Sequence, residues 1–212
     1  MRTDEPAPLS GRRAQAARND GLILDAARAV FVADPSASIA AVAERAGVGM
    51  SALYRRFGSK QELLAQLSAD GLEQYIAAVE AALADDEDPW RAFVGFMQAV
   101  TEADTHSLTQ RLAGTFTPTE ALNADAERSH ELLVRLFERV QAAGAIRPDL
   151  VADDLSFLFE QLAAVRVRDP QRRRELRLRY LALQLEALHG PAAGTLPGPA
   201  PTWGEVAERW DA

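Results

Sequence analysis

The segment "AERAGVGMSALYRRFGSKQELL", residues 43–64, decides the fold. Its pattern predicts that one helix ends at Gly47, because glycine adopts positive φ angles easily. A short helix of about residues 50–57 is predicted to follow. In this helix Leu53 and Phe57 are four residues apart and share one face, which we expect to be buried. The segment therefore predicts two helices joined by a tight turn.

Capping residues mark the neighbouring helices. Ser38 is of a type that caps a helix, here one of about residues 39–46. Ser59 followed by Glu62 has the spacing of a capping box for the next helix. A periodic apolar segment of about residues 14–33 supplies the first helix. Three short helices in this order form a helix-turn-helix, whose third helix enters the major groove of DNA. Any two packed helices joined by a glycine turn give the same pattern, so its specificity is low.

The rest of the chain also predicts helices. Asp88, Thr117 and Asp169 each precede a proline, a pattern typical of a helix cap followed by proline at the first helical position. Thr117 also has Glu120 at the capping-box spacing. The sequence contains no long alternating strand pattern. We therefore predict an all-α protein of about nine helices, with a three-helix helix-turn-helix domain ahead of a larger helical domain.

Composition divides the chain into four parts. Residues 1–11 are predicted to be a flexible N-terminal arm, and residues 12–66 the helix-turn-helix domain. Residues 67–189 form the predicted larger helical domain. Residues 190–212 are a Gly/Pro linker and a tail. The tail has tryptophans and a valine at helical spacing, which leaves open two interpretations, a short docked helix or a disordered tail.

The net charge of −8 is unevenly distributed. Residues 1–66 carry nine Lys/Arg and seven Asp/Glu, a net charge of +2, and the remainder carries fourteen and twenty-four, a net charge of −10. This asymmetry is compatible with a small anion-binding module at the N-terminus of an acidic protein.

Several classes of function lack their residues. The chain has no cysteine, which excludes disulfides and thiolate metal sites. No apolar run approaches the roughly 20 residues of a membrane helix, and no secretory signal is present, so we expect a cytoplasmic protein without membrane partners. The three histidines stand alone, and no phosphate-binding glycine loop or nucleophile motif occurs. We therefore predict no catalytic residues, no metal site and no cofactor.

The exposed face of the predicted 50–57 helix has residue types that suit DNA. Arg55 and Arg56 can pair bidentately with guanine. The Tyr54 hydroxyl and the Lys60 ammonium suit phosphate groups. Arginines ahead of the first helix form a basic arm that can contact phosphates or a minor groove. These are Arg12, Arg13 and Arg18. The alternatives are a solvated arginine pair, a half-buried tyrosine and an arm that serves only solubility.

Three stretches carry a resemblance to a known family. They are "ILDAARAVF" (23–31), "SIAAVAERAGVGMSALYRRF" (38–57) and "GSKQELL" (58–64). Together they resemble the DNA-binding domain of the tetracycline-repressor (TetR) family of transcriptional regulators. The resemblance implies a homodimer that binds a near-palindromic double-stranded DNA operator, usually as a repressor released by a small-molecule effector.

The resemblance also assigns individual residues. Ser38, Tyr54 and Lys60 match phosphate-contacting positions. The exposed positions of the recognition helix match Gly49, Met50, Ser51, Ala52, Arg55 and Arg56. Gly49 departs from the serine or other polar residue common at its position, so base contacts would depend mostly on the two arginines.

For the larger domain, residues 67–189, the resemblance implies a ligand-binding and dimerisation domain that dimerises through about residues 152–168 and 170–189. The sequence supports this, because the second segment is apolar on more than one side. The candidate pocket residues are mostly apolar, which would favour a hydrophobic or aromatic ligand. They are Trp90, Phe93, Phe96, Met97, His106, Gln110, Arg111, Phe116 and Leu133. Each of the apolar ones has plain core packing as its alternative.

Two other functions remain open at this point. One is a helical protein that binds small molecules or partners without binding DNA, against which the retained arginines argue. The other is an enzyme that uses the helical cavity, for which no constellation of nucleophile and base is found.

Overall fold

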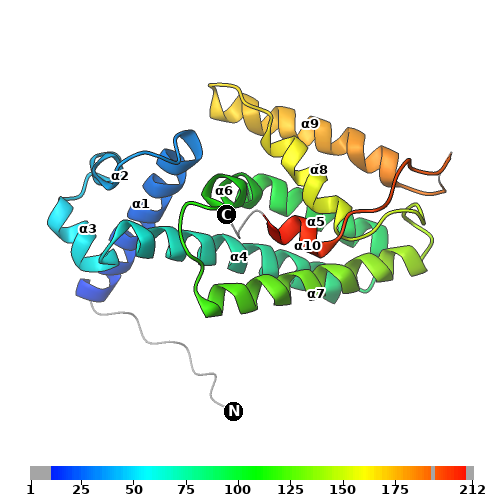
Figure 1. Ribbon diagram of the computed structural model, residues 1–212, viewed down its shortest axis with the longest axis horizontal. Helices are drawn as coiled ribbons and strands as arrows, with labels where there is room; N and C mark the ends of the chain where they lie inside the picture. The colour runs from blue at the N-terminus through cyan, green and yellow to red at the C-terminus, as the bar shows by residue number, and fades with distance from the viewer. Residues whose placement is uncertain (1–10, 192–193, 209–212) are drawn as a thin grey trace, which may run out of the picture. The chain divides into compact units, whose positions relative to one another are not determined.

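The computed structural model describes residues 11–191 and 194–208, with the side chains of residues 11–19, 107 and 109–111 left out (Figure 1). In these residues the chain forms ten α-helices and one isolated β-bridge, between Ile146 and His189. The prediction of an all-α fold is confirmed. The chain divides into two compact units, one ending at Leu67 and the other beginning at Ser68.

The first unit contains α1 (Gly11–Ala33), α2 (Ile39–Ala46), α3 (Met50–Phe57) and the start of α4 (Lys60–Ala84). Helix α1 begins three residues before the predicted position, and α2 and α3 have the predicted bounds. The unit has its own apolar core, with large side chains from all four helices. Its most buried members include Ile23, Phe31, Val42, Leu53, Phe57, Leu63, Leu64 and Leu67.

The turn between α2 and α3 depends on Gly47. Its φ is 66°, in the left-handed region that costs a residue with a Cβ more than it costs glycine. The Val48 N–H donates to the Ala43 carbonyl (3.0 Å) and the Gly47 N–H to the Glu44 carbonyl (3.2 Å). These two bonds form a Schellman motif, which ends α2 and turns the chain into α3.

The turn between α3 and α4 uses a second glycine. Gly58 has a φ of 66°, and a Cβ at this position would lie 2.5 Å from a carboxylate oxygen of Glu62. The Glu62 N–H donates to Ser59 Oγ (3.1 Å), which is one of the two bonds of the predicted capping box.

The second unit contains the rest of α4 and six more helices. These are α5 (Pro89–Ala103), α6 (Thr105–Leu112), α7 (Glu120–Ala142), α8 (Asp154–Ala163), α9 (Pro170–Leu188) and α10 (Trp203–Ala207). The apolar face of α5 packs on α7 and α9, and α8 packs on α6 and α9. Phe93, Phe96, Met97, Leu136 and Leu155 are almost fully buried in the resulting core.

Two of the three predicted proline-adjacent caps are confirmed. Asp88 accepts the N–H groups of Trp90 (2.9 Å) and Arg91 (3.2 Å), and Asp169 accepts that of Gln171 (2.9 Å).

The prediction for α7 was wrong, because the cap is Thr119 and not Thr117. Thr119 Oγ1 accepts the Leu122 N–H (3.2 Å), so Pro118 stands before the cap and not at the first helical position.

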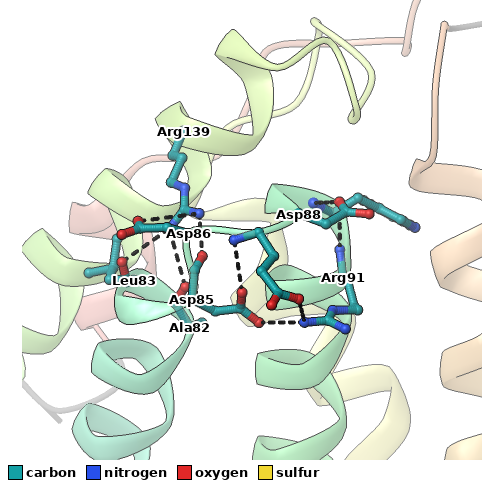
Figure 2. A network of polar contacts seen from close by, with 9 residues as sticks. Ala82, Leu83, Asp85, Asp86, Asp88, Arg91 and Arg139 are labelled. Atoms are coloured by element: carbon teal, nitrogen blue, oxygen red, sulfur yellow. Dashed lines mark hydrogen bonds and ion pairs between the residues drawn. The ribbon is translucent and has the colours of Figure 1, made fainter.

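The acidic connection between α4 and α5 is organised by two arginines, as Figure 2 shows. Arg139 of α7 donates to the last carbonyls of α4, including those of Leu83 (3.0 Å) and Asp85. Arg91 pairs with Glu87 (2.6 Å) and with the Asp85 carboxylate (3.4 Å). Arginine thereby satisfies helix-end carbonyls that have no intrahelical partner. In the described part of the chain, no cluster of acidic and histidine residues is suited to hold a metal ion.

The described part of the tail after α9 lies on the second unit. The Gly190 N–H donates to the Ala145 carbonyl (3.0 Å), beside the bridge between Ile146 and His189. Helix α10 follows a Gly/Pro stretch, and its Val206 is buried. Of the two interpretations that the sequence left open, the described tail adopts the short helix. None of the described helices has the length and apolar character to cross a membrane.

Candidate DNA-binding surface and ligand cavity

Helix α3 presents one face to its own unit and another to solvent. Leu53 and Phe57 are buried, as their spacing predicted. The rest of the helix surface is largely exposed, including Met50 (36 % exposed) and Tyr54 (45 %). Ser51 and Arg55 are also exposed, and Ala52 is half-buried. The predicted recognition residues therefore lie on a single accessible helix face.

Gly49 begins α3 through its backbone alone. Its carbonyl accepts the N–H groups of Ala52 (2.9 Å) and Leu53 (3.1 Å). With no side chain to cap the helix, it adds space and no donor to the exposed surface. The hydrogen-bonding side chains of this face are those of Ser51, Tyr54 and the two arginines.

The two arginines of α3 differ in their surroundings. Arg56 Nε lies 2.8 Å from Asp20 Oδ2 of α1, and its guanidinium stacks over the Phe57 ring at 5.1 Å. Arg55 is exposed, and the described residues show no ion pair for it. Arg56 is therefore oriented before any DNA is bound, whereas Arg55 is free to adapt.

Lys60 has a structural partner inside the unit. Its ammonium donates to the carbonyls of Ala37 (2.9 Å) and Pro35 (3.4 Å) and lies 5.1 Å from the centre of the Phe31 ring. The Ser38 hydroxyl accepts the Ala41 N–H (3.3 Å) as the cap of α2. Both predicted phosphate contacts thus lie where the α1–α2 connection meets the start of α4.

The N-terminal arginines are the least defined part of this surface. Arg12, Arg13 and Arg18 have their backbones in the first turns of α1, and their side chains lie outside the described residues. Their role in DNA contact stays a prediction.

The second unit encloses a cavity of about 390 Å³, a size within the range of small-molecule sites. It is lined by side chains of α4, α6, α7 and α10 and by Pro118 and Ser156. The aliphatic part of the cavity wall includes Leu72, Leu122, Leu133 and Val206. Its rings come from Tyr75, His106, His130 and Trp203.

Tyr75 is the central ring of this wall. It contacts Phe96 edge to face, with ring centres 5.4 Å apart. Burial raises the pKa of the Tyr75 phenol well above its ordinary value, so the hydroxyl is neutral at physiological pH. It can donate to or accept from a ligand.

Of the predicted pocket residues, the structure places His106 and Leu133 on the cavity wall. The four from α5, Trp90, Phe93, Phe96 and Met97, lie in or against the core because that face of α5 packs on α7 and α9. Trp90 stacks on Phe93 and on His189. Phe116 is also buried away from the cavity. The side chains of Gln110 and Arg111 lie outside the described residues.

Sequence reasoning missed most of the residues that line the cavity. Tyr75, His130 and Trp203 come from three segments far apart in the chain. The helical spacing of the tail was a signal for Trp203, but periodicity does not say where a helix docks. Such assemblies depend on tertiary packing.

The outer face of α9 exposes two large apolar side chains among charged ones. Leu181, Leu185 and Leu188 are buried in the core, while Tyr180 (47 % exposed) and Leu183 (59 %) point outward. The same helix is tied to its own unit by the buried Arg177. This residue pairs with Asp104 (2.5 Å) and donates to the Ala163 carbonyl (3.1 Å).

Comparisons with known proteins show which family this chain resembles. A model of the tetR family of bacterial regulatory proteins matches residues 23–67. A model of the C-terminal domain of SbtR-like transcriptional regulators matches residues 88–189. A search of curated protein sequences finds no significant match.

Solved structures of TetR regulators also match this chain. A TetR transcription regulatory protein from Mycobacterium vanbaalenii is 26 % identical, with a TM-score of 0.56, over 84 % of this chain and 98 % of that one. The regulator PfmR from Thermus thermophilus is 24 % identical, with a TM-score of 0.59, over 77 % and 97 %. The regulator LfrR from Mycobacterium smegmatis, solved in complex with proflavine, is 20 % identical, with a TM-score of 0.61, over 86 % and 99 %.

The last two identities are too low to support more than the fold, but the family models match segments in both units. The chain belongs to the tetR family of bacterial regulatory proteins and is a DNA-binding transcriptional regulator.

Proposed function

We propose that this regulator is a repressor that binds a near-palindromic operator as a homodimer and dissociates when a small hydrophobic or aromatic ligand enters the cavity of its second unit. The observation that carries the proposal is the exposed face of α3, fixed from behind by Leu53 and Phe57. This geometry presents Arg55 and Arg56 to the edges of base pairs in a major groove.

The contacts of the surface divide into two kinds. Arg55, Arg56 and the small residues of the first turn are suited to contact bases, and Ser38, Tyr54 and Lys60 to contact phosphates. Phosphate contacts supply affinity on any sequence and make it salt-dependent, while base contacts supply discrimination.

The test begins with selection of bound DNA from a random pool, followed by Kd measurements on the selected site and on random DNA. Arg55→Ala should reduce the preference for the selected site by about 1–3 kcal/mol. Lys60→Ala should weaken binding to both DNAs and lower the salt slope by about one. Arg135→Ala, an equal charge change on the exposed side of α7, is the control and should change neither. Equal affinity of the unmodified chain for selected and random DNA would overturn the proposal.

The proposed dimer uses α8 and α9. An exposed stripe with Tyr180 and Leu183 at its centre supports it, because neighbouring large apolar side chains left in solvent mark interaction sites. Two recognition helices related by a two-fold axis would explain a near-palindromic operator.

The proposed ligand response rests on the cavity. Helix α4 begins in the first unit and supplies Leu72 and Tyr75 to the cavity in the second. A ligand that contacts these residues therefore acts on a helix shared by both units. The solved relative LfrR, in complex with proflavine, is a family member with a small-molecule complex. Metabolite extracts added to the protein on its selected DNA should release it, and extracts without effect across all growth conditions would contradict this part.

An enzyme or a binding protein without DNA contact is not favoured. Asp153 orients His130 on the cavity wall, but no hydrogen bond described in the structure joins His130 to a serine hydroxyl of the lining. Activity that survives removal of residues 1–67 would be the result that reopens the question.

A further inference from the structure

We propose that α10 is a wall of the effector site, and that Trp203 gives this regulator a preference for planar ligands that are uncharged or cationic. The inference rests on the proposed function to the extent that the cavity is taken as the effector site. It goes further because the tail begins after residue 189, where the family match ends. The residues that would set ligand choice here thus lie outside the segments that the family models match.

Helix α10 has local reasons to be helical. The Glu205 N–H donates to Thr202 Oγ1 (3.4 Å) and the Thr202 N–H donates to Glu205 Oε2 (2.7 Å), which completes a capping box. A helix of five residues is too short to be stable alone. Its persistence therefore depends on what it packs against.

The packing partners of α10 are cavity residues. The Trp203 indole stacks on the His130 ring of α7, with ring centres 4.2 Å apart and planes 21° from parallel. His130 Nε2 lies 2.9 Å from Asp153 Oδ1, which fixes the orientation of the imidazole. Val206 is buried and, with Ala207, faces the same cavity. Figure 1 shows α10 lying against this unit beside α7.

The connection to α10 is attached at defined points. Asp149 Oδ2 accepts the Leu196 N–H (2.9 Å), and Arg147 donates to the Gly194 carbonyl (2.8 Å). Arg147 and Asp149 also pair with one another (2.7 Å). These bonds reduce the conformations open to a Gly/Pro segment and so raise the effective concentration of α10 at the cavity.

The chemistry of the wall points to a class of ligand. The lining has rings and aliphatic side chains as its main surface, and neither lysine nor arginine is among its described residues. Glu127 is the one carboxylate on the described lining. On the described lining, an anionic ligand would therefore meet no lysine or arginine and one carboxylate, whereas a cation would meet Glu127 and aromatic faces.

Hydrogen-bonding groups complete the site. Ser68 Oγ of α4 is buried on the cavity wall and makes no hydrogen bond in the described structure. A buried hydroxyl without a partner is costly, and a ligand group that reaches it relieves the cost. With the neutral Tyr75 hydroxyl, it suits a planar compound with an apolar body and a hydrogen-bonding group at its edge.

The experiment uses the full chain and three fluorescent planar probes of similar size. They are uncharged 1-aminoanthracene, cationic proflavine and anionic anthracene-2-sulfonate. Kd values are measured without DNA, for the unmodified chain, Trp203→Ala, Trp203→Phe and the control Leu196→Ala, whose side chain is exposed on the same tail. The first two probes should bind at least about tenfold more tightly than the anion. Trp203→Ala should weaken their binding about tenfold, Trp203→Phe by less, and Leu196→Ala hardly at all.

Two further readouts separate the possible failures. Thermal unfolding shows whether Trp203→Ala leaves the fold intact, and affinity for the selected DNA shows whether the first unit is unaffected.

If the unmodified chain binds the probes and Trp203→Ala binds them equally or more tightly, the inference is wrong and the proposed function stands. If the anion binds as tightly as the others, the assigned charge class is wrong. If none of the probes binds while extracts still release the DNA, the planar class is wrong. If none of the probes binds and no extract releases the DNA, this inference and the ligand part of the proposed function both fail.

Discussion

At the scale of single residues, Asp20 distinguishes two arginines that are adjacent in the sequence. Its carboxylate holds Arg56 at 2.8 Å, so this side chain loses less freedom on meeting DNA than Arg55 does. The pair is largely exposed and contributes little to stability. Its importance lies in the orientation of a guanidinium on the recognition face.

We predict that Asp20→Asn lowers sequence discrimination while raising affinity for random DNA. Loss of the partner lets Arg56 turn toward phosphates, and loss of a negative charge beside the DNA favours any sequence. We expect the Kd for random DNA to fall about two- to tenfold, with a smaller change on the selected site.

The control for this prediction is Asp25→Asn, an equal charge change on the exposed side of α1. Both variants are measured by fluorescence anisotropy at one fixed salt concentration. If the two variants shift both Kd values alike, then Asp20 acts through its charge alone and does not position Arg56.

At the scale of elements, the α2–α3 turn shows why a glycine is needed at one position. Gly47 has open space around its Cα but a φ of 66°, so the cost of a side chain there comes from the backbone alone. Gly95, in the middle of α5, also has open space, and its φ is not in the left-handed region.

The two glycines predict opposite results for the same substitution. Gly47→Ala should lower the free energy of unfolding by about 1 kcal/mol, because alanine is strained at a positive φ. Gly95→Ala should raise it by up to about 1 kcal/mol, because alanine loses less entropy in a helix. Chemical denaturation of both variants measures the two changes. If Gly95→Ala lowers the free energy of unfolding as much as Gly47→Ala does, then the space available to the new methyl group, and not the φ angle, determines the cost.

The connection between α9 and α10 should make the stability of the folded chain depend on pH, through the carboxyl group of Asp149. A hydrogen bond from the Arg147 guanidinium, and then one from the Leu196 N–H, hold the pKa of the Asp149 carboxyl well below its usual range. A depressed pKa in the folded state means that the stabilisation is complete above the unfolded pKa of about 4 and is lost as the pH falls below it.

We therefore expect Asp149→Asn to lower the Tm by a constant amount from about pH 8 to pH 5, and by less as the pH falls below about 4. The measurement is thermal unfolding of both proteins across this range, as far down as the unmodified chain remains folded. Asp125→Asn, on the exposed side of α7, serves as the control. A Tm difference that does not vary with pH would show that ionisation of Asp149 plays no part.

The elements also show what sequence can predict. The bounds of α2 and α3 were predicted correctly because Ser38, Gly47 and Leu53 act locally, within one turn of their own positions. The cap of α7 was misplaced because Thr117 and Thr119 are both of a type that caps helices, and residue type alone does not choose between them. The cavity was mostly missed because its wall combines helices that no local pattern brings together.

At the scale of the whole molecule, the net positive charge and the exposed apolar stripe lie in different segments of the chain. The net positive charge lies in residues 1–66, and the exposed apolar stripe lies on α9. An operator with two half-sites needs two recognition helices, which one chain does not supply. Dimerisation and DNA affinity should therefore be lost together when the stripe is disrupted.

We predict that Leu183→Glu converts the protein to a monomer that binds the selected operator at least about tenfold more weakly. Leu183 is 59 % exposed, so the change should not disturb the core of its own chain, whereas two glutamates facing one another across a two-fold axis would repel and be costly to bury. Gln98→Glu, on the exposed side of α5, is the matched control and should leave both properties unchanged. Analytical ultracentrifugation gives the mass, and anisotropy gives the Kd on one half-site and on the full site. A monomeric variant with undiminished affinity for the full site would show that one chain suffices for operator binding, and a variant that remains dimeric would place the interface elsewhere.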